Sequence, residues 1–190
     1  MTMAALWLTA AAGAAQAHPA VGSADSFIAH YAHPLSGLDH IVVIAAVGAC
    51  AALKGGRALW LWPAAFIGVV LVGALLGMAQ TPLPFIEAGI LASLVVMGLV
   101  VAMAGNLPYS TGAVLIGACA LFHGHAHGAE MPETVGRLAY IAGFVATTAA
   151  LLFVGIGITL HLSRRRLAPL IRATGAVCAV IGLAMGAAAM

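Results

Sequence analysis

The sequence predicts an all-α polytopic membrane protein, a bundle of six transmembrane helices after a cleavable N-terminal signal peptide. Two observations carry this prediction. Of the 190 residues, 64% are hydrophobic and only 6% are charged, with a mean hydropathy of +1.13, which lies outside the usage of soluble globular proteins. Apolar runs of the length that crosses a ~30 Å hydrocarbon core also recur along the chain.

Residues 1–17 form an apolar stretch that ends in Ala15-Gln16-Ala17. Small residues at this spacing are typical of the cleavage site of a secretory signal peptide. No lysine or arginine precedes the apolar stretch, so an uncleaved membrane anchor is the alternative. We expect a signal peptide over residues 1–17, a mature chain that begins at His18, and one six-helix transmembrane domain over residues 18–190.

Six apolar spans follow, and polar, proline- or glycine-containing connections separate them. KGGR ends the first span, AQTPLP the second and GNLPYS the third, while a His-rich segment ends the fourth and an arginine run the fifth. Glycines four residues apart, in Gly73-x-x-x-Gly77 and Gly182-x-x-x-Gly186, predict close helix contacts. The expected spans cover about residues 35–53, 58–78, 85–104, 109–126, 136–160 and 167–190.

The basic residues predict how the spans are oriented. A signal peptide leaves the segment that follows it outside the cytoplasm, so the first span runs inward and the others alternate. Cytoplasmic connections carry an excess of Lys and Arg. On this topology only Arg137 lies outside, and both termini of the mature chain are extracytoplasmic. The basic residues at the cytoplasmic side are Lys54, Arg57, Arg164, Arg165, Arg166 and Arg172.

Histidine and carboxylate side chains gather at the opposite, outer side. All histidines except His161 lie there, and so do the five acidic residues. Because the topology rests on the signal peptide and the basic residues, this gathering is a separate observation, and it predicts an extracytoplasmic site that attracts cations. The near-even charge balance, without a basic patch interleaved with aromatic residues, excludes nucleic acid as a partner. The acidic residues are Asp25, Asp39, Glu87, Glu130 and Glu133.

The stretch HPLSGLDH carries the first candidate ligands. Pro34 disfavours helix at His33 and suits the first turn of the helix that follows. Asp39 and His40 come about one turn later, and an ionised Asp at that depth is costly unless it is paired or faces a polar cavity. Two imidazoles and one carboxylate can therefore converge.

The stretch HGHAHGAE carries the second set. A continuous helix aligns His123, His127 and Glu130 on one face and points His125 elsewhere. Two further residues at the same level, Glu87 of the third span and His18 with its free amine, are additional candidates.

Imidazole and carboxylate together suit first-row divalent ions such as Ni²⁺, Co²⁺, Zn²⁺ and Cu²⁺. Each residue taken alone has a simpler interpretation, because a histidine at a helix end is often a cap and an aspartate in a span often hydrogen-bonds a neighbouring helix. The set taken together favours a metal, since so many ionisable groups at one level of a membrane need a compensating charge.

The phrase HPLSGLDHIVVIAAVG resembles the first-helix signature of the HupE/UreJ family of nickel/cobalt permeases, and FHGHAHGAE resembles their fourth-helix signature. The stretch from Pro63 to PFIEAGILAS is similar to their second and third helices. One departure is Ile44, where the family often has methionine. The resemblance implies secondary uptake of Ni²⁺ or Co²⁺, and it implies that the residues important for transport are His33, Asp39, His40, Glu87, His127 and Glu130.

We therefore expect a permease domain in a bacterial inner membrane that captures a divalent metal at its outer face and passes it inward. It is not an enzyme on this interpretation and has no prosthetic group, and no nucleotide-binding loop indicates ATP coupling. The sequence leaves open the physiological metal, the driving force and the oligomeric state. The alternatives are an extracytoplasmic metal-binding or sensing protein without transport, and a membrane metalloenzyme. They stay open because the only ionisable residue in the inner half of a span is Arg172, so an inward route relies on carbonyls, water, Met97, Met103, Thr147 or Thr148.

Overall fold

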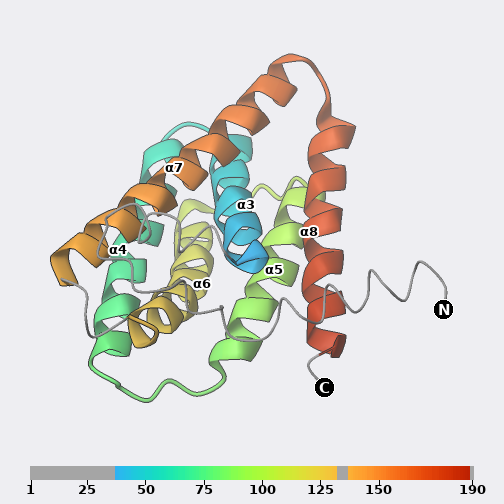
Figure 1. Ribbon diagram of the computed structural model, residues 1–190. Helices are drawn as coiled ribbons and strands as arrows, with labels where there is room; N and C mark the ends of the chain where they lie inside the picture. The colour runs from blue at the N-terminus through green and yellow to red at the C-terminus, as the bar shows by residue number, and fades with distance from the viewer. Residues whose placement is uncertain (1–36, 132–136, 189–190) are drawn as a thin grey trace.

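The computed structural model describes residues 37–131 and 137–188, and all regular secondary structure in these residues is helical (Figure 1). The helices agree in order and approximate bounds with the expected spans, although the fourth extends three residues further and the fifth four. The predicted signal peptide, His18 and His33 lie outside the described residues. The helices are α3 (Leu38–Lys54), α4 (Ala58–Met78), α5 (Ile86–Ala102), α6 (Tyr109–Ala129), α7 (Arg137–Arg164) and α8 (Ala168–Ala188).

The helices have the character of a membrane protein. In length and composition α4, α7 and α8 meet the requirement for crossing a membrane, while α5 is apolar but has only 17 residues. In α6, three histidines near the end lower the hydropathy. Large apolar side chains such as Trp60 and Leu138 are 71% and 85% exposed, which suits a surface that faces lipid better than one that faces water.

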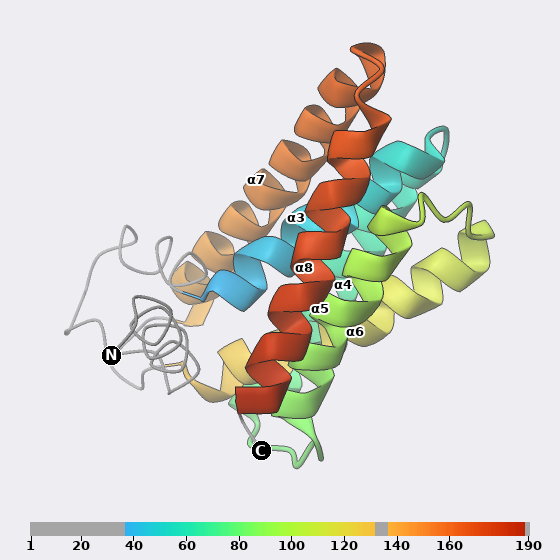
Figure 2. The same cartoon turned by 90° about the vertical axis from the view of Figure 1, so that its right-hand side faces the viewer.

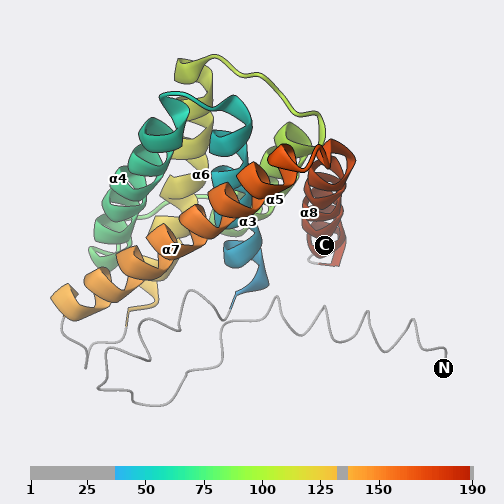
Figure 3. The same cartoon turned by 90° about the horizontal axis from the view of Figure 1, so that it is seen from above.

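The helices are arranged as three close pairs: α4 with α6, α5 with α8, and α3 with α7. Each pair joins one of the first three helices to one of the last three. Figures 2 and 3 show α8 alongside α5 and α4 alongside α6. Contacts between different pairs are sparser, and the largest of them join α3 to α5 and to α4.

Glycines bring the helices of each pair into backbone contact. In the pair of α4 and α6, a Cβ added to Gly73 would lie 2.5 Å from the Leu121 carbonyl oxygen, and one added to Gly124 would meet the Val70 carbonyl. Only glycine fits at such a contact. The predicted contact at Gly73 and Gly77 is therefore confirmed. Among the glycines of α8, Gly182 packs against Leu94, whereas an added Cβ on Gly186 meets nothing within 4 Å.

Successive helices run in opposite directions, so the bundle has two distinct ends with different polar residues. At one end, Lys54 Nζ donates a hydrogen bond to Asn106 Oδ1 over 2.7 Å, and Arg172 Nε donates to the Ala102 carbonyl over 2.8 Å. The connection between α7 and α8, with its arginine run, is at this end (Figure 1). The first turns of α3 and α5 and the last turn of α6 lie at the other end. Asp39, Glu87 and the histidines of α6 are therefore separated from Lys54, Arg172 and the arginine run, as the sequence predicts.

Candidate metal site

His40 lies in the first turn of α3 next to Asp39. A carboxylate in the first turn suits the positive end of the helix dipole, and Lys54 in the last turn suits the negative end. Asp39 Oδ1 is 3.0 Å from His40 Nδ1. Because a carboxylate can only accept, Nδ1–H is the donor, and the lone pair of the neutral His40 ring is on Nε2.

The two sequence stretches meet at His40. Its ring centroid lies 4.6 Å from that of His123 and 4.3 Å from that of His127, both on α6. The four-residue spacing of the two α6 histidines places them on one face of the helix, as expected. The three residues are only 1–3% exposed. We refer to His40, His123 and His127 as the imidazole cluster.

Two aromatic residues of α7 close the cluster on one side. The ring centroid of Phe144 lies 4.7 Å from that of His127. The hydroxyl of Tyr140 donates a hydrogen bond to the His127 carbonyl over 2.8 Å. Both aromatic side chains are 2% exposed. The cluster is thus shielded from solvent by apolar contacts, which strengthens electrostatic interactions inside it.

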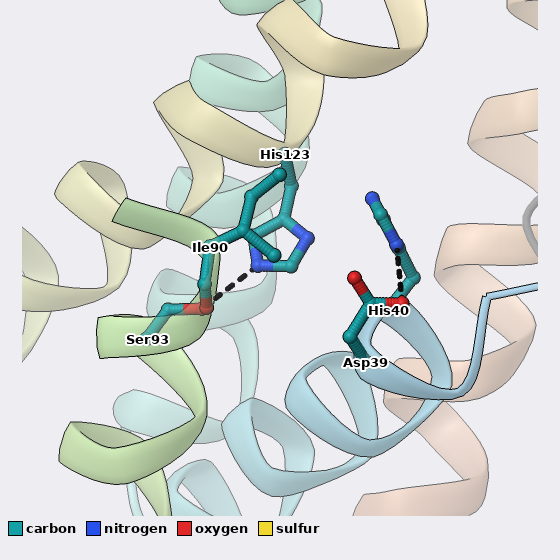
Figure 4. Close-up of polar contacts among 5 residues, drawn as sticks. All are labelled: Asp39, His40, Ile90, Ser93 and His123. Carbon is teal, nitrogen blue, oxygen red and sulfur yellow. Dashed lines mark hydrogen bonds and ion pairs between the residues drawn. The ribbon is translucent and has the colours of Figure 1, made fainter. Parts of the chain in front are cut away.

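His123 is held by a residue that sequence reasoning did not identify. Ser93 of α5 has its Oγ 2.8 Å from His123 Nε2 and 2.6 Å from the Ile90 carbonyl oxygen (Figure 4). The other ring nitrogen of His123, Nδ1, is buried and has no hydrogen-bond partner among the described residues. The only sequence signal for Ser93 is a single hydroxyl within an apolar run, and nothing in the sequence relates it to a histidine 30 residues away.

The remaining predicted ligands are placed differently. Glu87, in the first turn of α5, and Glu130, directly after α6, have exposed side chains, in contrast to the buried histidines. His18 and His33 lie outside the described residues. The structure therefore brings together Asp39 and the imidazole cluster and leaves the two glutamates at the surface of the same end.

Within residues 37–131 and 137–188, no group of three or more His, Cys, Asp or Glu side chains is arranged to hold a metal ion as it stands. The contacts give the reason. Asp39 occupies one nitrogen of His40, Ser93 occupies one nitrogen of His123, and the rings of the cluster meet edge to face. Shared coordination of one ion requires the rings of His40 and His127 to turn about their side-chain bonds toward His123.

His125 is directed away from the cluster, as its position in the helix predicts. Its Nε2 donates a hydrogen bond to the Thr81 carbonyl over 2.7 Å. The side chain lines a separate cavity of about 360 Å³ between α6 and the connection from α4 to α5, together with Gln80 and Pro82. His125 therefore provides a control residue for experiments on the cluster.

Of the residues expected along an inward route, three are buried in the bundle and one is exposed at its end. Met97, one turn beyond Ser93 on α5, is 1% exposed, and Thr147 and Thr148 on α7 are also buried. The hydroxyl oxygen of Thr148 has no hydrogen-bond partner in the described part of the chain. Met103, in contrast, is 72% exposed and follows the end of α5, so it lies outside the interior of the bundle.

A family profile described as HupE / UreJ protein matches residues 6–185. The chain belongs to the HupE/UreJ family. It is also 43% identical over 143 residues to Protein HupE of Rhizobium leguminosarum bv. viciae, an alignment that covers 75% of each chain. No solved structure matches the chain.

Membership of the HupE/UreJ family confirms the resemblance inferred from the two signatures. It connects the chain with nickel and cobalt transport, and it places the chain among permeases and accessory proteins rather than among enzymes. Together with the apolar helices, it identifies a membrane protein.

Proposed function

We propose that this chain is a secondary transporter that takes up a divalent transition metal, Ni²⁺ or Co²⁺, from the extracytoplasmic side of a bacterial inner membrane. In this proposal all six helices cross the membrane, the imidazole cluster lies near the outer face, and the basic end faces the cytoplasm. The signal peptide is removed, and both termini of the mature chain are extracytoplasmic.

One observation carries the proposal: a buried imidazole nitrogen, His123 Nδ1, lacks a hydrogen-bond partner among the described residues and lies beside two further buried imidazoles. Leaving a polar atom buried and unsatisfied costs about 1–3 kcal/mol. Imidazole lone pairs are preferred ligands of first-row divalent ions, and a bound cation removes this cost. The carboxylate of Asp39, in contact with His40, supplies compensating negative charge.

The proposed ligands act in two stages. Exposed carboxylates and the histidines near the N-terminus capture the hydrated ion, and the buried cluster then replaces part of its water shell. The capture set is His18, His33, Glu87 and Glu130, and the inner set is Asp39, His40, His123 and His127. Met97 and the buried threonines of α7 are polarisable or polar groups that lie further along α5 and α7 toward the basic end.

Uptake of radioactive nickel into liposomes that contain the purified protein tests this function. We expect accumulation in parent liposomes, a loss of accumulation in His127→Ala, and little change in His125→Ala. Competition by Co²⁺, Zn²⁺ and Cu²⁺ ranks the metals. Metal binding without accumulation would contradict transport and would favour the binding or sensing alternative.

A further inference from the structure

The Ser93 hydroxyl lies between two partners of different chemistry. Its Oγ is 2.6 Å from the Ile90 carbonyl oxygen, three residues back on α5, and 2.8 Å from His123 Nε2 on α6. Ser93 is 2% exposed and His123 is 1% exposed, so water does not substitute for either contact. The direction of these two hydrogen bonds is therefore set by the donors and acceptors present.

A hydroxyl has one proton to donate, and a carbonyl oxygen can only accept. Two oxygens 2.6 Å apart repel each other unless a proton lies between them, so the Ser93 proton is directed to the Ile90 carbonyl. The Ser93 oxygen then acts as the acceptor for His123. Consequently Nε2 carries the proton of the neutral His123 ring, and its lone pair is on Nδ1.

Nδ1 is the buried nitrogen that has no hydrogen-bond partner among the described residues. In Figure 4 it lies on the side of the ring that faces His40, whereas Nε2 faces Ser93. We propose that Ser93 is a positioning residue that fixes the His123 tautomer and ring orientation, so that Nδ1 is the atom that donates to the transported metal. This inference rests on the proposed function and specifies its donor atom.

His40 is held in the same way, but through its other ring nitrogen. Asp39 accepts the Nδ1 proton of His40 and leaves Nε2 as the lone pair, while Ser93 accepts the Nε2 proton of His123 and leaves Nδ1. Histidines that bind metals commonly donate their other ring N–H to such an acceptor, which fixes ring orientation and tautomer. Because Nδ1 is nearer to the backbone than Nε2, the ion is held close to α6, toward α3 rather than between α6 and α5.

Metal titration of purified variants tests the role of Ser93. Ser93→Ala removes the acceptor, and we expect it to weaken Ni²⁺ binding about 10- to 100-fold, the usual range for the loss of such a partner. Ser93→Thr keeps a hydroxyl at the same place and should retain the affinity of the parent. Thr174→Ala is the matched control, because Thr174 Oγ1 makes the same hydrogen bond to a carbonyl three residues back, at 2.7 Å on α8, with no histidine beside it.

Nuclear magnetic resonance of protein labelled with ¹⁵N-histidine measures the tautomer directly. The His123 signals are assigned by their loss in His123→Gln. In the metal-free parent we expect a protonated Nε2 and an unprotonated Nδ1. Saturation with diamagnetic Zn²⁺ should shift Nδ1 and leave the Nε2 proton in place. A proton on Nδ1 in the parent, or a Zn²⁺-induced loss of the Nε2 proton, would overturn the inference.

Different results would overturn the inference about Ser93 and the proposed function. A parent protein that binds and transports nickel while Ser93→Ala binds with unchanged affinity overturns the inference about Ser93 and leaves the proposed function intact. A parent that shows the expected tautomer but binds neither Ni²⁺ nor Zn²⁺ overturns the proposed function, and the donor role of Nδ1 with it.

Discussion

The Asp39→Asn variant tests whether the carboxylate next to His40 supports metal binding. The substitution keeps the shape of the side chain but removes its charge. The carboxylate accepts a hydrogen bond of 3.0 Å from a ring nitrogen of His40, whose side chain is 4% exposed. Hydrogen bonds to charged groups contribute about 1.5–3 kcal/mol, compared with about 1 kcal/mol for neutral pairs. The variant retains a neutral acceptor, so the hydrogen bond is weakened rather than lost.

The loss of charge acts on the bound ion as well as on His40. A unit charge 4 Å from another contributes about 4 kcal/mol at an effective dielectric constant of 20, and the solvent exposure of Asp39, 17% of its side chain, reduces this contribution. The weaker hydrogen bond accounts for about 0.5–2 kcal/mol, and the lost attraction between the carboxylate and the ion adds to it. We therefore take about 1.5–3 kcal/mol as the expected loss, which corresponds to about 10- to 150-fold weaker binding.

Two measurements check this prediction. Titration of purified protein with Ni²⁺ gives the affinity, and uptake of radioactive nickel into liposomes gives the transport rate. His125→Ala is the control, because His125 hydrogen-bonds the Thr81 carbonyl away from the cluster and should leave both values near those of the parent. Affinity of Asp39→Asn within twofold of the parent would refute the role assigned to the carboxylate.

Three further predictions concern packing, topology and processing. Gly124→Ala should lower the melting temperature, because the added Cβ meets the backbone of α4. Gly68→Ala, whose Cβ has nothing within 4 Å, should leave the melting temperature unchanged or raise it slightly. Equal melting temperatures of the two variants would contradict the close packing of α4 and α6. In a background without the native cysteines, an impermeant thiol reagent applied to whole cells should label a cysteine at Thr134 but not one at Arg165, and the reverse pattern would invert the proposed topology. The intact mass of membrane-extracted protein should correspond to a chain that begins at His18, and a mass that retains the first segment would show an uncleaved anchor.

The sequence predicted the local features of the fold well. The helices follow the apolar runs because hydropathy and connection residues are local signals. The common face of His123 and His127 follows from helical geometry alone. Their contact with His40 agrees with the expectation that the two sequence stretches lie at one end of the bundle.

The sequence did not predict which helices pack together. Small residues occur on several faces of every span, so composition does not select α6 as the partner of α4 or α8 as the partner of α5. Ser93 was missed for this reason: its role depends on the approach of α5 to α6, and a serine in an apolar run carries no mark of its partner. The sequence pattern also does not predict that Glu87 is exposed, because a carboxylate at a helix start can face either the bundle or the solvent.

The paired arrangement of the helices has a mechanical consequence. Backbone contacts at glycines leave little room for movement within a pair, so we expect each pair to move as a unit and sliding to occur along the sparser surfaces between pairs. The imidazole cluster lies where all three bodies touch: His40 belongs to one, His123 to the second, and Ser93 to the third. Any relative displacement of the bodies changes the distances between these side chains. An ion that binds across the junction therefore selects one arrangement of the three bodies, and the same arrangement sets how tightly the ion is held.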